Sequence, residues 1–189
     1  LDFVVFRSAL EAGGSVRAIV AKQAAKTLTR KEIDKLTEKA KGIGAKGLAW
    51  ARIAEDGTVA SSFAKFMTED EMNRVKEKCG AENGDVILVV ADKKDLTLSV
   101  LGSLRQIVAK KLDIIPEDKY NLLWVVEFPF FDWDEDAKQF VAMHHPFTSP
   151  MDECLDYLET DKASVRAKAY DLVLNGVELC SGSIRITNP

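Results

Sequence analysis

The chain has few cysteines and histidines and lacks long apolar runs, and each scarcity excludes a class of protein. Its three cysteines, Cys79, Cys154 and Cys180, stand far apart among 189 residues. An odd number without paired spacing argues against a disulfide framework or a zinc site and favours a reducing cytoplasm. No apolar run approaches the ~20 residues of a membrane-spanning helix, and the start, LDFVVFRSALEAGG, has no basic region typical of a signal peptide.

Charge is abundant but unevenly distributed. Residues 1–120 carry 21 Lys and Arg against 18 Asp and Glu, whereas residues 121–189 carry 5 against 12. The basic excess of the first part is small beside that of a dedicated nucleic-acid-binding protein, so a solvated surface is its simplest interpretation. The asymmetry predicts two units, with a boundary near residue 120.

The first unit alternates strand and helix signals. Apolar and β-branched runs predict strands at residues 15–21, 47–53 and 86–91 and a return strand at 58–66. Thr29 with Glu32, and Thr68 with Glu71, have the spacing of capping boxes, which predicts that a helix begins after each threonine. A further helix is predicted from the apolar spacing between Leu96 and Leu112. The pattern is typical of an α+β domain.

The second unit is predicted to be mostly antiparallel β. An apolar strand at residues 121–128 precedes a turn-rich acidic loop at 129–138. Ser149 and Pro150 have the order of an N-cap and a first helical residue, which predicts a helix there. Asn175-Gly176 between two β-rich runs is a strong hairpin signal.

Both histidines, His144 and His145, are adjacent in AMHHPFTSP. Neighbours in an extended segment point to opposite sides, so they rarely bind one metal ion together. Pro146 holds His145 in an extended conformation. The segment is interpreted either as a semi-rigid loop that presents imidazoles over a pocket or as two polar residues with local hydrogen bonds.

The hairpin strand ELCSGSIRI carries two charged residues, Glu178 and Arg185, among small and apolar ones. A guanidinium fits a carboxylate through two parallel hydrogen bonds, and a glutamate can hold Mg²⁺ or a ribose hydroxyl. Gly182 would let a flat ligand approach the backbone. The alternative is an exposed charged pair on the open face of a sheet.

At these residues the sequence resembles bacterial aspartyl-tRNA synthetase, a class II enzyme. The segments AMHHPFTSP and AYDLVLNGVELCSGSIRI resemble its catalytic domain, and GAKGLAW and LGSLR resemble the GAD domain inserted into that enzyme. The resemblance implies a GAD-like insert domain at 1–120 and part of the catalytic antiparallel sheet at 121–189. Motifs 1, 2 and 3 are absent, which predicts a fragment. Departures are Cys180-Ser181-Gly182, where three glycines are frequent, and Val90-Ala91-Asp92 in place of Gly-Ala-Asp.

The family implies activation of aspartate with ATP and Mg²⁺ and transfer of the aspartyl group to tRNA. By resemblance, His144, His145, Ser183 and Arg185 bind aspartate, and Glu178 binds ATP and its Mg²⁺. The complete enzyme is expected to be a cytoplasmic homodimer without a membrane partner, and the fragment alone is expected to be inactive. Charging of aspartate tRNA only, or of asparagine tRNA also, stays open. The alternative function is a non-catalytic, tRNA-associated module related to the domain in amidotransferase B subunits.

These roles constrain the strand. Glu178 and Arg185 are seven residues apart, so a regular strand would place them on opposite faces. One extra residue would restore them to one face, and β-bulges concentrate beside active sites. We therefore predict a bulge or ladder break between Leu179 and Ser183, with Gly182 as the residue that takes an unusual backbone angle.

Overall fold

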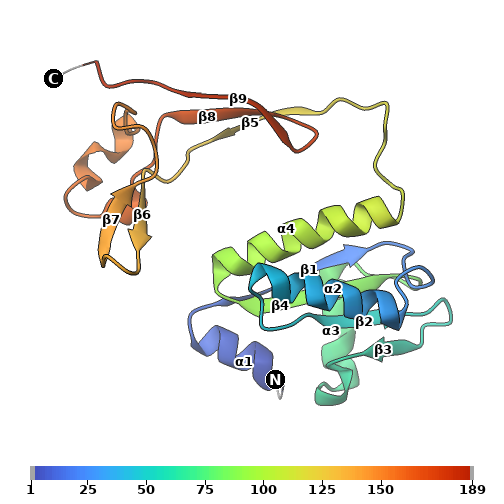
Figure 1. The fold of residues 1–189 in the computed structure, drawn as a ribbon. Helices are drawn as coiled ribbons and strands as arrows, with labels where there is room; N and C mark the ends of the chain where they lie inside the picture. The colour runs from blue at the N-terminus through green and yellow to red at the C-terminus, as the bar shows by residue number, and fades with distance from the viewer. Residues whose placement is uncertain (1–2, 188–189) are drawn as a thin grey trace. The chain divides into compact units, whose positions relative to one another are not determined.

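The computed structural model describes residues 3–187, and Figure 1 shows its two compact units. The first unit ends at Ile115 and the second begins at Pro116. No helix in the described part of the chain is long and apolar enough to cross a membrane. The fold is mixed α and β with antiparallel sheets, as the sequence predicted.

The first unit contains a four-stranded antiparallel sheet with the order β1-β4-β2-β3. The strands are β1 (Ser15–Ala21), β2 (Ala49–Ile53), β3 (Val59–Ser61) and β4 (Val86–Asp92). The helices are α1 (Val4–Glu11), α2 (Arg30–Ile43), α3 (Glu69–Cys79) and α4 (Lys94–Lys111), with the short 3₁₀ helix η1 (Ala64–Phe66).

Two apolar clusters hold this unit together, one on each face of the sheet. Leu88 and Val90 of β4 pack in the cluster that includes α2 and α4. Ile87 and Val89 of the same strand pack in the cluster that includes Phe6 of α1 and residues of α3. Because successive side chains of a strand point to opposite faces, β4 is covered on both sides and forms the centre of the unit.

The two predicted capping boxes have different outcomes. At α3 the box is confirmed: the Glu71 N–H donates to the Thr68 hydroxyl over 3.2 Å, and the Thr68 N–H donates to the Glu71 carboxylate over 3.0 Å. At α2 the helix begins after Thr29 as predicted, but no side-chain cap bond forms. Glu32 instead pairs with the ammonium groups of Lys35 and Lys111, which attract its carboxylate away from the backbone.

Two further parts of the first unit differ from the prediction. The return strand is only β3, because the chain leaves the ladder after Ser61 and buries Phe63 completely. Helix α1 carries no cap signal and was not predicted. Its residue Phe6 is buried against Phe3 and Phe63, so tertiary packing forms this short helix.

The second unit contains a three-stranded antiparallel sheet, β5-β8-β9, and a separate two-stranded hairpin, β6-β7. Their bounds are β5 (Leu122–Val126), β6 (Phe131–Asp134), β7 (Gln139–Ala142), β8 (Ala169–Leu174) and β9 (Val177–Ser183), with 3₁₀ helices η2 (Asp152–Tyr157) and η3 (Lys162–Ser164). The hairpin predicted at Asn175-Gly176 is confirmed. Both residues have positive φ, 50° and 83°, as a type I′ turn requires.

Two predictions for the second unit are wrong. The acidic segment at 129–138 contains strand β6, so it is half of a hairpin rather than a loop. No helix begins at Pro150, which forms an isolated bridge with Ala167. The Ser149 hydroxyl donates to the Pro150 carbonyl, and the short helix η2 begins only at Asp152. The pairing with residue 167 holds the backbone extended where the cap signal predicted a helix.

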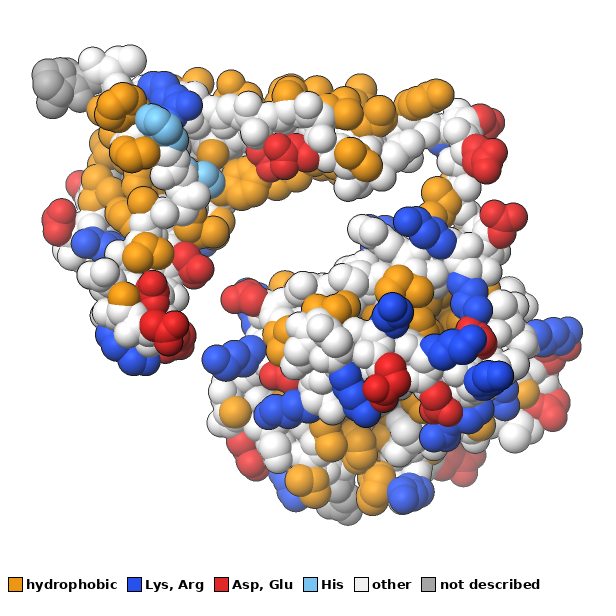
Figure 2. All heavy atoms as spheres, in the orientation of Figure 1, with side chains coloured by type: hydrophobic (Ala, Val, Ile, Leu, Met, Phe, Trp, Pro, Cys, Tyr) orange, Lys and Arg blue, Asp and Glu red, His pale blue; other side chains and the backbone are white. Residues whose placement is uncertain are grey.

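The three-stranded sheet exposes apolar side chains on both faces. Every residue of β5 is exposed, with Leu122 at 61% and its neighbour Leu123, on the opposite face, at 51%. Figure 2 shows hydrophobic side chains along this sheet. Apolar surface of this extent on a sheet is typical of a surface that another part of a protein covers.

Candidate functional site

The two histidines have separate local partners. The His144 ring nitrogen Nε2 lies 2.9 Å from the Pro129 carbonyl, and because a carbonyl only accepts, Nε2 carries the proton. The His145 nitrogen Nδ1 accepts from the Phe147 N–H over 3.2 Å. His145 is exposed and His144 is half-buried. The rings therefore do not share one partner, which is the arrangement expected for adjacent residues.

The end of the histidine segment is joined to the chain that follows β9. Two backbone hydrogen bonds of 2.8 Å connect residues 147–149 with residues 184–186 in antiparallel order. Thr148 and Arg185 lie opposite each other between these bonds. Side chains of such a pair lie close together on one face. The structure thus brings the histidine segment next to Arg185.

Ser183 belongs to the same group. Its hydroxyl lies 3.3 Å from the Thr148 hydroxyl. Thr148 is only 1% exposed, whereas Arg185 is exposed to solvent. Ser183 is half-buried, so its exposure is intermediate between those of Thr148 and Arg185.

The predicted irregularity of β9 is confirmed, and its position is defined. Glu178 and Cys180 pair with consecutive residues of β8, so Leu179 is the extra residue. With this shift, Glu178, Ser183 and Arg185 follow the same alternation and emerge on one face of the sheet.

The part of the prediction that concerned Gly182 is wrong. Gly182 is a regular member of the ladder opposite Tyr170, and it is not among the residues with positive φ. A Cβ at this position would lie 2.7 Å from the Tyr170 hydroxyl. Glycine at this position lets the tyrosine ring lie directly over the strand, and no unusual backbone angle is involved.

A further carboxylate, Asp171, lies on the same face and was missed by sequence reasoning. Asp171 and Val173 are two residues apart on β8 and therefore point to the same face. Val173 pairs with Glu178, so the carboxylates of Asp171 and Glu178 project from adjacent strands to that face. The signal was present in the sequence: counting back from the Asn175-Gly176 turn in steps of two assigns Asp171 to the face of Glu178.

These carboxylates alone do not form a metal centre. Among residues 3–187 no three His, Cys, Asp or Glu side chains are grouped closely enough to hold a metal ion. Mg²⁺ commonly uses one or two carboxylates and takes its other ligands from substrate phosphates and water. Asp171 and Glu178 fit that second pattern.

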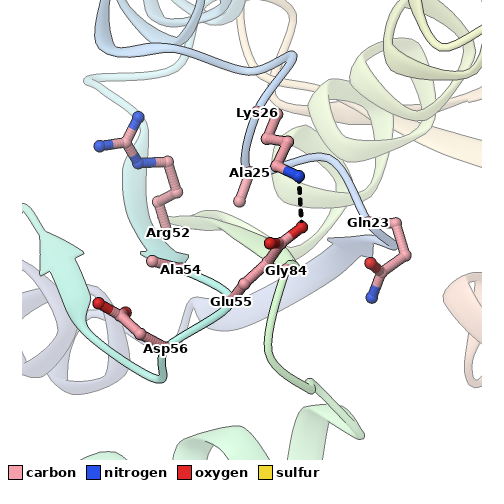
Figure 3. A pocket seen from close by; sticks show the side chains of 8 residues that line it. All are labelled: Gln23, Ala25, Lys26, Arg52, Ala54, Glu55, Asp56 and Gly84. Atoms are coloured by element: carbon pink, nitrogen blue, oxygen red, sulfur yellow. Dashed lines mark ion pairs between the residues drawn. The ribbon is translucent and has the colours of Figure 1, made fainter.

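A pocket in the first unit is a separate candidate (Figure 3). It is lined by Gln23, Ala25, Lys26, Arg52, Ala54, Glu55, Asp56 and Gly84. The Lys26 ammonium lies 2.6 Å from the Glu55 carboxylate, and both side chains are mostly exposed. The pair is a solvated surface pair of small energetic value. All residues that the sequence predicted as binding residues lie in the second unit.

The first unit defines the class of protein. Residues 6–101 match the family model of the GAD domain. The chain belongs to the GAD domain family.

The rest of the chain is also similar to known proteins. The chain is 55% identical to the aspartate–tRNA ligase of Ruminiclostridium cellulolyticum over 184 residues, which are 97% of this chain and 31% of that protein. It is 54% identical to the aspartate–tRNA ligase of Clostridium beijerinckii over 98% of the chain. It is 52% identical to the aspartate–tRNA(Asp/Asn) ligase of Caldanaerobacter subterraneus, also over 98%. The chain spans about a third of the length of these relatives.

Proposed function

We propose that this chain is part of an aspartate–tRNA ligase, with a GAD insert domain at 1–120 and part of the catalytic domain at 121–189. The observation that carries the proposal is the register shift at Leu179. It places Glu178 on the same sheet face as Ser183 and Arg185, which lie beside the histidine segment, and Asp171 projects to that face from the adjacent strand. An amino acid and a nucleotide are ligands that such a face suits.

The cationic end of this face suits aspartate. Arg185 is exposed and would bind a carboxylate of aspartate through both arms of its guanidinium. The Ser183 hydroxyl lies on the same face and would donate to the same ligand. His144 and His145 come from the segment paired with Arg185 and would close over the amino acid.

The acidic end suits the nucleotide. Glu178 and Asp171 would hold a Mg²⁺ ion that arrives with ATP. Such an ion offsets the negative charge of the phosphates. Their separation along the strand from Arg185 keeps the carboxylates away from the carboxylates of aspartate, which they would repel.

The reaction needs no protein nucleophile. A carboxylate oxygen of aspartate attacks the α-phosphorus of ATP, and the bond to the departing pyrophosphate breaks, giving aspartyl-adenylate. A hydroxyl of the terminal adenosine of tRNA then attacks the aspartyl carbonyl, and AMP leaves. The residues of this chain hold the reacting groups in position, which by itself lowers the barrier of a bimolecular step. A cytoplasmic homodimer that binds tRNA belongs to the same proposal.

The alternative hypothesis is a non-catalytic, tRNA-associated module, since the GAD match covers only the first unit. The similarity of the second unit to ligases argues against it, because a module of that kind would not need the face with Arg185 and Glu178.

The test uses the protein translated from the complete reading frame that contains this sequence. We expect ATP–pyrophosphate exchange that depends on aspartate and not on glutamate or asparagine. Glu178→Gln and Asp171→Asn should each lower exchange by at least about tenfold, because each removes a charged ligand. Exchange that is absent, or that does not depend on aspartate, contradicts the proposal and favours the module.

A further inference from the structure

Thr148 is the residue at which the histidine segment, Ser183 and Arg185 meet. Its N–H donates to the His145 carbonyl over 2.8 Å and closes the turn that carries the exposed histidine. Its hydroxyl contacts the Ser183 hydroxyl at 3.3 Å. Thr148 also lies opposite Arg185, which belongs to the antiparallel segment beside it. Three independent contacts of one side chain and its backbone thus reach three residues of the proposed aspartate site.

Burial makes the Thr148 hydroxyl unusual. The residue is 1% exposed, and it is one of three buried polar residues in the described part of the chain. A buried hydroxyl is costly unless it is hydrogen-bonded, and valine would fill the same space without that cost. Packing alone therefore does not require a threonine here.

The hydroxyl contact restricts Ser183. A serine hydroxyl has one donor and two acceptor positions and rotates freely when it has no partner. The bond to Thr148 removes one of these positions and so fixes how the remaining ones face the exposed side, where Arg185 lies. A donor fixed before binding loses less rotational freedom when the ligand arrives.

We propose that Thr148 is a positioning residue for aspartate: its hydroxyl orients the Ser183 hydroxyl, and its backbone fixes the histidine turn beside Arg185. The inference rests on the proposed function. Thr148 is buried and does not touch the substrate, so it acts through Ser183.

Thr148→Val in the complete protein tests the inference, with Thr148→Ser as the matched control that keeps the hydroxyl. Thr148→Val should raise the KM for aspartate about three- to tenfold, the effect of one hydrogen bond. The KM for ATP should change by less than about twofold, because the carboxylates of the acidic end lie elsewhere on the strand. Thr148→Ser should keep both KM values close to those of the unaltered protein.

A double-mutant cycle separates positioning from packing. If Thr148 acts through Ser183, Thr148→Val should have no further effect on the KM for aspartate once Ser183→Ala is present. Independent, multiplying effects, or a rise of both KM values after Thr148→Val, would overturn the inference. Should Thr148→Val not fold, Thr148→Cys, a weaker donor of similar size to serine, takes its place. Equal KM values for Cys and Ser would then overturn it.

The exchange activity of the unaltered complete protein distinguishes failure of the proposed function from failure of the inference on Thr148. Aspartate-dependent exchange combined with an unselective Thr148→Val effect overturns only the inference. Absence of aspartate-dependent exchange in the unaltered protein overturns the proposed function and the inference together.

Discussion

At the residue scale, Asp85 stabilises the first unit from a fully buried position. Its carboxylate accepts from the N–H groups of Gln23 and Glu82 over 2.9 Å and lies 3.0 Å from the Lys22 ammonium. Burial raises the pKa of Asp85, but the two N–H groups and Lys22 outweigh it, so that the pKa lies below its ordinary value. The carboxylate thus joins the end of β1 to the turn before β4.

Asp85→Asn should destabilise the chain by about 2–3 kcal/mol, because the amide offers only one acceptor oxygen to the two N–H groups and lacks the charge that strengthens these bonds. Urea unfolding of the 189-residue chain measures the difference. Asp56→Asn is the matched control, since Asp56 is exposed and its carboxylate accepts from the Thr58 N–H at the surface. Equal effects of the two substitutions would contradict the role assigned to Asp85.

Glu32 predicts a pH dependence. Hydrogen bonds from Lys111, and then from Lys35, lower the pKa of Glu32 to about 2. A lowered pKa in the folded state gives stability that is complete above the ordinary pKa of 4.5 and is lost as the pH falls toward about 2. The unaltered chain should therefore exceed Glu32→Gln in stability at neutral pH, and the difference should disappear toward pH 2.

Urea midpoints measured at several pH values test this dependence. Glu38→Gln, which removes an exposed pair with Lys41, is the control and should show a smaller difference. A difference between the unaltered chain and Glu32→Gln that stays constant from neutral pH to about pH 2 would show that the lysines do not hold the Glu32 carboxylate.

At the element scale, the sequence predicted those features that depend on neighbouring residues. The capping box at Thr68 and the turn at Asn175-Gly176 are local, and both are present. The identical signal at Thr29 gave a helix but no cap bond, because Lys111, distant in sequence, attracts Glu32. Pro150 likewise is held in an extended bridge by a residue outside its own segment.

The candidate site was also predicted only in part. A strand irregularity was predictable from the parity of Glu178 and Arg185, but the extra residue is Leu179 and not the glycine. Gly182 stays in the regular part of the ladder opposite Tyr170, whose ring occupies the space over the glycine. Asp171 was missed although the predicted hairpin register already assigns it to the face of Glu178, through Val173.

Deletions in β9 test the single-face arrangement. Without Leu179, Glu178 and Arg185 would be six residues apart in a regular ladder, which keeps both on one face. Without both Leu179 and Cys180 they would be five apart and would point to opposite faces. In the complete protein we expect aspartate-dependent exchange to stay within about tenfold after the single deletion and to fall by more than about a hundredfold after the double deletion, with a folded circular dichroism spectrum in both. Equal exchange by the two deletion variants would contradict the single-face arrangement.

At the scale of the whole molecule, the two units differ in how much of their apolar surface they bury. Both faces of the first sheet are covered by helices and contribute to buried clusters. The second sheet leaves β5 exposed on both sides. The chain spans about a third of the length of the relatives it matches.

This difference predicts the behaviour of separate pieces. A polypeptide of residues 1–115 should unfold in one cooperative thermal transition, whereas residues 116–189 alone should show none, because that unit buries too little apolar surface. The 189-residue chain alone should give background ATP–pyrophosphate exchange. Cooperative unfolding of 116–189 would show that the second unit is stable alone, and exchange by the 189-residue chain would show that its residues form a complete catalytic site.

The most direct test of the central claim is the aspartate kcat/KM of Arg185→Lys in the complete protein, measured by ATP–pyrophosphate exchange. Lysine keeps the charge but loses the two-armed contact with a carboxylate. The account predicts a fall of about ten- to a hundredfold, the value of one charge-assisted pair, with little change in the KM for ATP. A fall of less than about threefold would show that Arg185 does not bind aspartate.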